Sequence, residues 1–96
     1  MNNKEIQEFK NMFNVDALVP KKFNYQKDHD TISCDYYLGQ INIIVALQKY
    51  KDDNYIVCIS KVETFPNSLY RDELEFKRFS KIKTFNKALR ILKNNL

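Results

Sequence analysis

The residues with the greatest potential for chemistry are few, and they begin with the only histidine. His29 stands between Asp28 and Asp30. An imidazole beside two carboxylates could bind a metal ion or accept a proton. Adjacent residues on a tight turn rarely converge on one ion, and no second histidine is present to complete a zinc site. We therefore expect a solvated turn here, with no metal and no cofactor.

The two cysteines, Cys34 and Cys58, lack the short spacing of a metal-binding pair. A cysteine nucleophile would need a base, and His29 is the only histidine that could serve Cys34. Two cysteines also cannot build the disulfide framework of a small secreted domain. We expect two reduced, buried thiols in a cytoplasmic protein.

Two groups of carboxylates could chelate magnesium, the pair Asp52-Asp53 and the acidic group within residues 72–75. Both fall where solvated loops are expected, and neither is accompanied by a patterned base. One glycine, Gly39, cannot form a phosphate-binding loop. The sequence therefore holds no recognisable catalytic set, and we expect a protein that is not an enzyme.

The segment 63–73 is the least regular part of the sequence, because Pro66 and its polar neighbours favour a loop. Its apolar side chains could pack beneath the loop as an extension of the core. If they are exposed, they could anchor a protein interface, where Tyr and Phe are enriched. Two tyrosines on the outer side of the sheet or at its margin could extend that surface. The candidate partner-binding residues are Phe65, Leu69, Tyr70, Tyr37 and Tyr50.

Positive charge is concentrated at the end of the chain. Residues 76–96 carry seven Lys or Arg and no Asp or Glu: Lys77, Arg78, Lys81, Lys83, Lys87, Arg90 and Lys93. Basic groups near a helix C-terminus are favoured by its dipole, by about 0.3–1 kcal/mol each, so a solvated helix face is one interpretation. The other is a continuous patch for phosphates or for an acidic protein. Stacking on bases needs exposed rings, and we expect Phe76, Phe79 and Phe85 to be core residues.

Two amphipathic helices are predicted at the ends of the chain. Ile6, Phe9 and Phe13 form one apolar stripe over residues 3–13, and Pro20 prevents any continuation. Thr84 can cap the second helix. The apolar side of that helix is lined by Phe85, Ala88, Leu89, Leu92 and Leu96.

Between the helices the apolar period is two, which indicates strands. The predicted strands cover 22–26, 31–38, 41–48 and 55–60, and short turns separate them. The segment 74–79 is predicted to be a fifth strand. A helix is the alternative there, because Phe76, Phe79 and Ile82 recur every three residues.

Short turns join antiparallel strands, whereas parallel strands need long crossovers. The sequence thus predicts one α+β domain over residues 1–96, a four- or five-stranded antiparallel meander with an N-terminal and a C-terminal helix, in the order α-β-β-β-β-(β)-α. We expect both helices to cover one face of the sheet. An exposed edge strand could support a homodimer.

The composition bears on function and origin. The apolar run at 41–47 is too short to span a membrane, so no membrane partner is expected. Lys, Asn and Ile are abundant, which is typical of an AT-rich genome. We expect a small non-enzymatic protein-binding module, such as a phage or mobile-element inhibitor of a host nucleic-acid-processing or defence system, as anti-CRISPR proteins are. The alternative is a nucleic-acid-binding protein that uses the basic segment 77–93.

Overall fold

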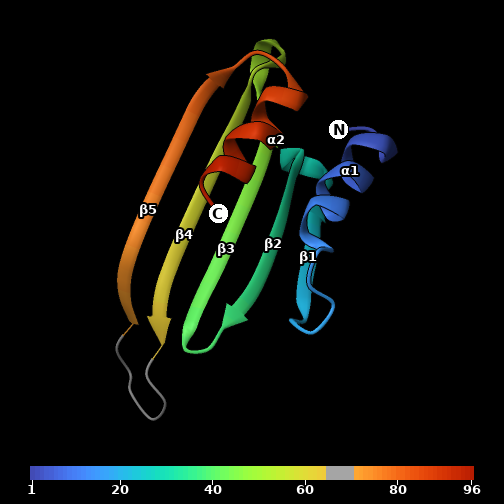
Figure 1. The fold of residues 1–96 in the computed structure, drawn as a ribbon. Helices are drawn as coiled ribbons and strands as arrows, with labels where there is room; N and C mark the ends of the chain where they lie inside the picture. Colours follow the sequence, from blue (N-terminus) through green and yellow to red (C-terminus); the bar gives the residue numbers. More distant parts are fainter. Residues whose placement is uncertain (65–70) are drawn as a thin grey trace.

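The computed structural model of the chain describes residues 1–64 and 71–96, the side chains of 71–73 excepted (Figure 1). Along the chain, one helix precedes the strands of a single sheet and a second helix follows them. The elements are α1 (Asn3–Phe13), β1 (Lys21–Gln26), β2 (Thr31–Leu38), β3 (Ile41–Lys49), β4 (Tyr55–Thr64), β5 (Arg71–Ile82) and α2 (Phe85–Asn94). Two short 3-10 turns, Lys27–His29 and Lys51–Asp53, join β1 to β2 and β3 to β4.

The described strands form one antiparallel meander in the order β1-β2-β3-β4-β5. Each strand pairs with its neighbour in sequence, as the short predicted turns require. Gly39 takes a left-handed backbone, with φ of +61°, in the tight turn between β2 and β3. The predicted α+β meander is confirmed, with the optional fifth strand present.

The last strand contains a β-bulge that explains its misleading sequence pattern. Tyr55 pairs with Ile82 and Val57 with Phe79, so two residues of β5 lie opposite the one residue Ile56. The extra residue resets the alternation of the strand and lets Phe79 and Ile82 face the same side. The helical alternative for 74–79 is therefore wrong, and its period of three is that of a bulged strand.

Phe76 lies on the other side of β5 from Phe79, because the two are an odd number of residues apart with no bulge between them. Its side chain is 56% exposed. The expectation that Phe76 is a core residue is wrong, whereas Phe85 is buried and Phe79 packs partly against the core.

The irregular segment expected at 63–73 is shorter at both ends. β4 continues to Thr64 and β5 begins at Arg71, and these two residues pair with each other. The backbone N–H of Thr64 also donates to the carbonyl of Gln40 at 2.8 Å. A second bulge lies beyond Lys61 and Glu75. The hydrogen-bonded pairing of β4 with β5 thus extends both strands beyond the residues that show an alternating apolar pattern.

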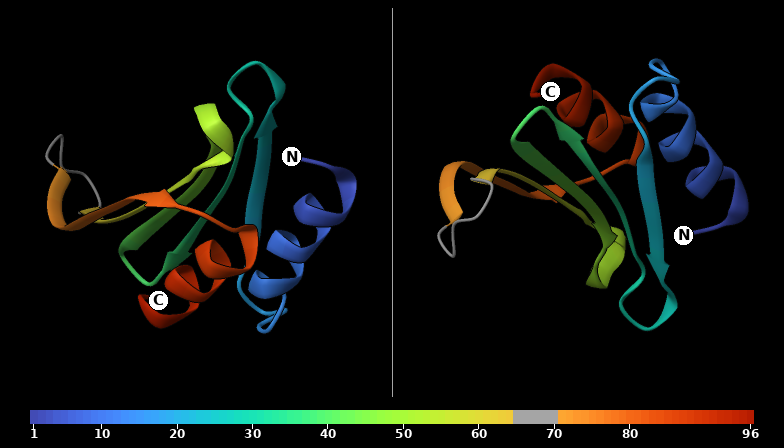
Figure 2. Two further views of the ribbon diagram at one scale, coloured as in Figure 1. Left: turned by 90° about the horizontal axis from the view of Figure 1, so that it is seen from above. Right: turned by 90° about the horizontal axis from the view of Figure 1, so that it is seen from below.

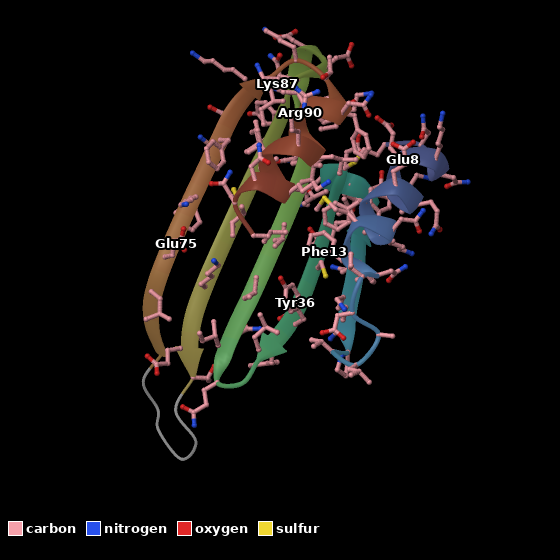
Figure 3. The ribbon with its side chains drawn as sticks, in the orientation of Figure 1. Glu8, Phe13, Tyr36, Glu75, Lys87 and Arg90 are labelled. Carbon is pink, nitrogen blue, oxygen red and sulfur yellow. The ribbon has the colours of Figure 1, made fainter. Side chains whose placement is uncertain are left out.

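Both helices cover the same face of the sheet (Figure 2). The buried hydrophobic residues of this layer are Phe9, Phe13, Ile32, Cys34, Ile43, Val45, Leu47, Tyr55, Val57, Ile59, Ile82, Phe85, Ala88 and Leu92. Phe13 packs 4.9 Å from Phe9 and 6.3 Å from Tyr36, ring centre to ring centre (Figure 3). Such aromatic pairs add about 0.5–1.5 kcal/mol each beyond the area that they bury.

The helix ends follow their capping residues. The Asn2 side chain accepts from the N–H of Glu5 at 2.8 Å, and the Glu5 carboxylate accepts from the N–H of Asn2. Thr84 caps α2 through the N–H of Lys87. Leu96 lies beyond α2 and is 45% exposed, so its expected place on the apolar stripe is wrong. Within the described chain, no helix has the length and apolar character of a membrane span.

We expect Leu92→Ala to lower the free energy of unfolding by about 2–5 kcal/mol, because the side chain is fully buried between α2 and the sheet. Leu18→Ala is the matched control, since Leu18 is 92% exposed and should change stability by less than about 0.5 kcal/mol. Urea unfolding followed by circular dichroism measures both. Equal losses in the two variants would contradict the placement of the core.

Candidate functional site

The sheet face opposite the helices carries apolar side chains that no described helix covers. We call it the open face and define it by Tyr37, Ile44, Ala46, Ile56, Cys58, Phe76 and Arg78. The register aligns Ala46, Cys58 and Arg78 in one row across three strands. Because β3 and β4 are apolar at both odd and even positions, their second set of side chains has to lie on this face.

The exposure of the open face is greatest towards β5 and at the end of β2. Phe76 is 56% exposed and Tyr37 is 52% exposed, and Ile44 and Ile56 are partly exposed. Leu74, in the bulge next to Phe76, is 52% exposed. Large apolar side chains that share one surface are typical of interaction sites.

A buried polar residue fixes one end of the open face. Asn42 is only 1% exposed and pairs with Tyr37 across β2 and β3. Its side-chain N–H groups donate to the Asp35 carboxylate and, at 3.2 Å, to the carbonyl of Tyr36. This satisfied network holds the end of the β2–β3 hairpin in one arrangement, so Tyr37 extends from a rigid support.

A hollow of about 470 Å³ lies at the opposite end of the open face. We call it the Tyr50 hollow. Its walls come from the β3–β4 connection, from β4 and from the bulged end of β5: Tyr50, Lys51, Asp52, Asn54, Ile56, Arg78, Ser80 and Lys81. Because the bulge sets both Ser80 and Lys81 opposite Ile56, two consecutive side chains of β5 reach the same hollow.

Two residues of the Tyr50 hollow have left-handed backbones, Asp52 with φ of +63° and Lys81 with φ of +58°. Aspartate visits this region readily, because its short side chain can bond locally. A lysine gains no such compensation, and its left-handed conformation costs about 1–2 kcal/mol relative to a right-handed one. The surrounding ladder holds Lys81 in this conformation.

Only two of the five predicted partner-binding residues belong to the described part of the chain, and the structure places these two far apart. Phe65, Leu69 and Tyr70 lie outside the described residues. Tyr37 and Tyr50 are both about half exposed, at 52% and 51%. They stand at opposite ends of the sheet, since Tyr37 pairs near the start of β3 and Tyr50 follows its last residue. Tyr50 therefore belongs to its own hollow and does not extend the surface around Tyr37.

The seven predicted basic residues lie on different surfaces. Lys77 faces the helix side, where its ammonium lies 2.8 Å from the Glu75 carboxylate and 3.3 Å from the Asn95 side chain. Arg78, its neighbour, points to the open face. Lys81 lines the Tyr50 hollow, and Lys83 is exposed between β5 and α2. The exposed cations of α2 are Lys87, Arg90 and Lys93, and Figure 3 labels the first two.

Among the acidic candidates, the side chains of Asp72 and Glu73 lie outside the described residues, and those of the others are exposed or already engaged. Glu75 accepts from Lys77 and pairs with Lys61 at 3.5 Å. The hydrogen bond from Lys77, with the positive charge of Lys61, holds the pKa of Glu75 below its ordinary value. Asp52 and Asp53 are exposed. The described residues hold no group of three or more His, Cys, Asp or Glu side chains that could bind a metal ion.

His29 is exposed in the turn before β2, where its carbonyl accepts from the side chains of Thr31 and Gln48. Asp30 instead turns away to accept from the Tyr25 hydroxyl at 2.5 Å and from the N-terminal ammonium. The bond to Asp30 raises the pKa of Tyr25 to about 12. Sequence reasoning missed this cluster, because its members come from three separate segments.

The two thiols lie on opposite faces of the sheet. Cys34 is fully buried under the helices, and burial raises the pKa of its thiol to about 11. Cys58 is on the open face, so the expectation of a buried thiol is only partly met there. Burial raises the pKa of Cys58 too, against the positive charge of Arg78. Neither thiol has the lowered pKa of a nucleophile.

We expect Cys34 to resist alkylation in the folded protein. A pKa raised from 9.0 to about 11 lowers the thiolate fraction at pH 8 about 100-fold, and burial blocks access as well. Mass spectrometry after timed labelling with iodoacetamide should show modification at Cys58 first. Both residues should react together in urea. Labelling of native Cys34 at the rate seen in urea would contradict this placement.

Comparison with known proteins gave no matching family model, no matching curated protein and no matching solved structure. Among the described residues, the open face and the Tyr50 hollow are two surfaces whose geometry suits binding.

Proposed function

We propose that this protein is a non-enzymatic module that binds a partner protein through the open face of its sheet. The observation that carries the proposal is the exposed aromatic and aliphatic surface around Phe76, Leu74 and Tyr37, on the side of the sheet away from both helices. Water contact with such a surface is unfavourable, by about 25 cal/mol for each Å² of apolar area.

Phe76 is the expected anchor of this interface. Its ring is the most exposed Phe or Tyr side chain among the described residues, and Ser60 opposite it is too small to shield it. Aromatic anchors surrounded by residues that exclude water carry most of the binding energy in protein interfaces. The guanidinium of Arg78 on the same face could pair with a carboxylate of the partner and fix its orientation.

Composition supports the choice of partner class. A sequence rich in Lys, Asn and Ile is typical of an AT-rich genome, such as that of a phage or other mobile element. We propose that it works inside the host cell as an inhibitor of a nucleic-acid-processing or defence machine, by covering a functional surface. Surface fit would suffice for such inhibition.

We expect Phe76→Ser to weaken the captured complex at least about 30-fold, since loss of an aromatic anchor costs about 2 kcal/mol or more. Affinity capture from nuclease-treated host extract, followed by titration of the purified partner, measures this. Leu18→Ser is the control, because it removes an apolar side chain from a different surface that is even more exposed, at 92% against 56% for Phe76.

Circular dichroism should show both variants folded. Capture of no specific host protein, or a complex that Leu18→Ser weakens and Phe76→Ser does not, would refute docking on the open face. If wild type alone sediments as a dimer that Phe76→Ser dissociates, the open face binds a second copy and the inhibitor proposal fails.

A second candidate function is nucleic-acid binding by α2. Lys87 and Arg90 lie on the exposed surface of the helix, and neither forms an ion pair among the described residues (Figure 3). Lys93 follows them one helical turn along. Such a row could contact successive phosphates.

If all three cations of α2 contact phosphates, duplex affinity should fall about 40-fold between about 50 and 200 mM salt. Lys87→Glu with Arg90→Glu should remove most of the binding and flatten the salt dependence. Lys22→Glu with Lys27→Glu reverses the same charge on exposed residues elsewhere and is the control. Equal losses in both pairs, measured by fluorescence anisotropy, would contradict a specific role for α2.

A further inference from the structure

The Tyr50 hollow collects positive charge that the described residues leave uncompensated. Lys51, Arg78 and Lys81 line it together with one carboxylate, that of Asp52. None of the three cations forms an ion pair within the described part of the chain. Like charges that share a concave surface repel one another, and an anion placed between them removes that repulsion.

The bulge is the feature that brings Lys81 to this place. A regular strand would alternate sides after Phe79 and would turn Ile82 away from the core. The extra residue keeps Ile82 buried and sets Lys81 beside Ser80 and Arg78 at the hollow. Glycine would take the left-handed backbone of this position without strain. The lysine therefore supplies a charge at a site where its backbone is unfavourable, which is typical of functional positions.

An aromatic ring completes the hollow. Tyr50 is 51% exposed. Its backbone N–H donates to the carbonyl of Asn54 at 2.6 Å, and this bond closes the turn between β3 and β4. An exposed ring beside arginine and lysine suits a flat base that stacks and a phosphate that pairs with the cations. The hollow, at about 470 Å³, lies within the range of about 300–1,000 Å³ that small-molecule sites occupy.

We propose that the Tyr50 hollow binds a nucleotide, with its phosphate held by Arg78 and Lys81 and its base against the ring of Tyr50. The hydroxyl of Ser80 and the amide of Asn54 offer further hydrogen bonds to the ligand. The same chemistry serves a free nucleotide or one unit of a single strand. The proposal does not depend on protein binding around Phe76 or on phosphate contacts by α2.

The test is a titration of ¹⁵N-labelled protein at low salt with four probes: inorganic phosphate, adenosine, adenosine 5′-monophosphate and a single-stranded hexanucleotide. The monophosphate should shift the backbone amides of the residues that line the hollow and should bind more tightly than adenosine or phosphate. A hexanucleotide that binds more tightly than the monophosphate and competes with it identifies a strand as the natural ligand. Equal affinities identify the free nucleotide.

Lys81→Gly separates binding from folding. It removes the charge and also the strained backbone, so the urea midpoint should equal or exceed that of wild type while affinity for the monophosphate falls about tenfold or more. Lys83→Ala is the charge-matched control, because Lys83 is exposed outside the hollow. Tyr50→Leu should reduce the affinity for the monophosphate and leave that for phosphate unchanged.

Three results would overturn the proposal: no shift of the lining amides with any probe, wild-type affinity in Lys81→Gly, or an equal loss of affinity in Lys83→Ala. Unchanged binding of the monophosphate by Tyr50→Leu would overturn the stacking of its base. Loss of partner capture in Phe76→Ser with intact nucleotide binding would leave this site standing, so the two proposals fail separately.

Discussion

The strict alternation of side chains along a β-strand is the constraint on which this structure depends. Each strand sends half of its residues to each face, and the helices α1 and α2 cover only one of these faces. In β3 and β4, apolar residues occupy both sets of positions. The chain therefore builds a closed core on one side and presents Ile44, Ile56 and Phe76 on the other.

The bulge near the end of β5 shows what breaking that alternation achieves. It keeps Ile82 in the core and places the adjacent residue, Lys81, at the surface. Bulges often redirect a side chain next to a functional site. Here one irregular position links the stability of the helix-covered layer to the chemistry of the Tyr50 hollow.

Much of this fold could be predicted from local patterns. The stripe of Phe9 and Phe13 with its Asn cap marks α1, and alternation marks β2 and β3. The pattern was misleading at Phe76 and Phe79, because a spacing of three suggests one helical face until a bulge is known to follow. Only the pairing register reveals that bulge, and register is a property of two strands together.

The candidate site was harder to predict for the same reason. Tyr50 and Lys81 are far apart in sequence, and they line one hollow only because β4 pairs with both β3 and β5. Successive residues of β5 also point to opposite faces, so the adjacent residues Lys77 and Arg78 lie on different sides of the sheet. Composition located the positive charge correctly along the chain, but it carried no information about the surface on which each charge lies.

The meander order has a consequence for how the chain folds during synthesis. Because each described strand pairs with the one before it, the hairpins from β1 to β4 can close over short turns as soon as they leave the ribosome. The helix that shields Val57 and Ile59 follows all of these strands in the chain. Before α2 is made, only α1 covers this face of the nascent sheet, so the core over Val57 and Ile59 closes last.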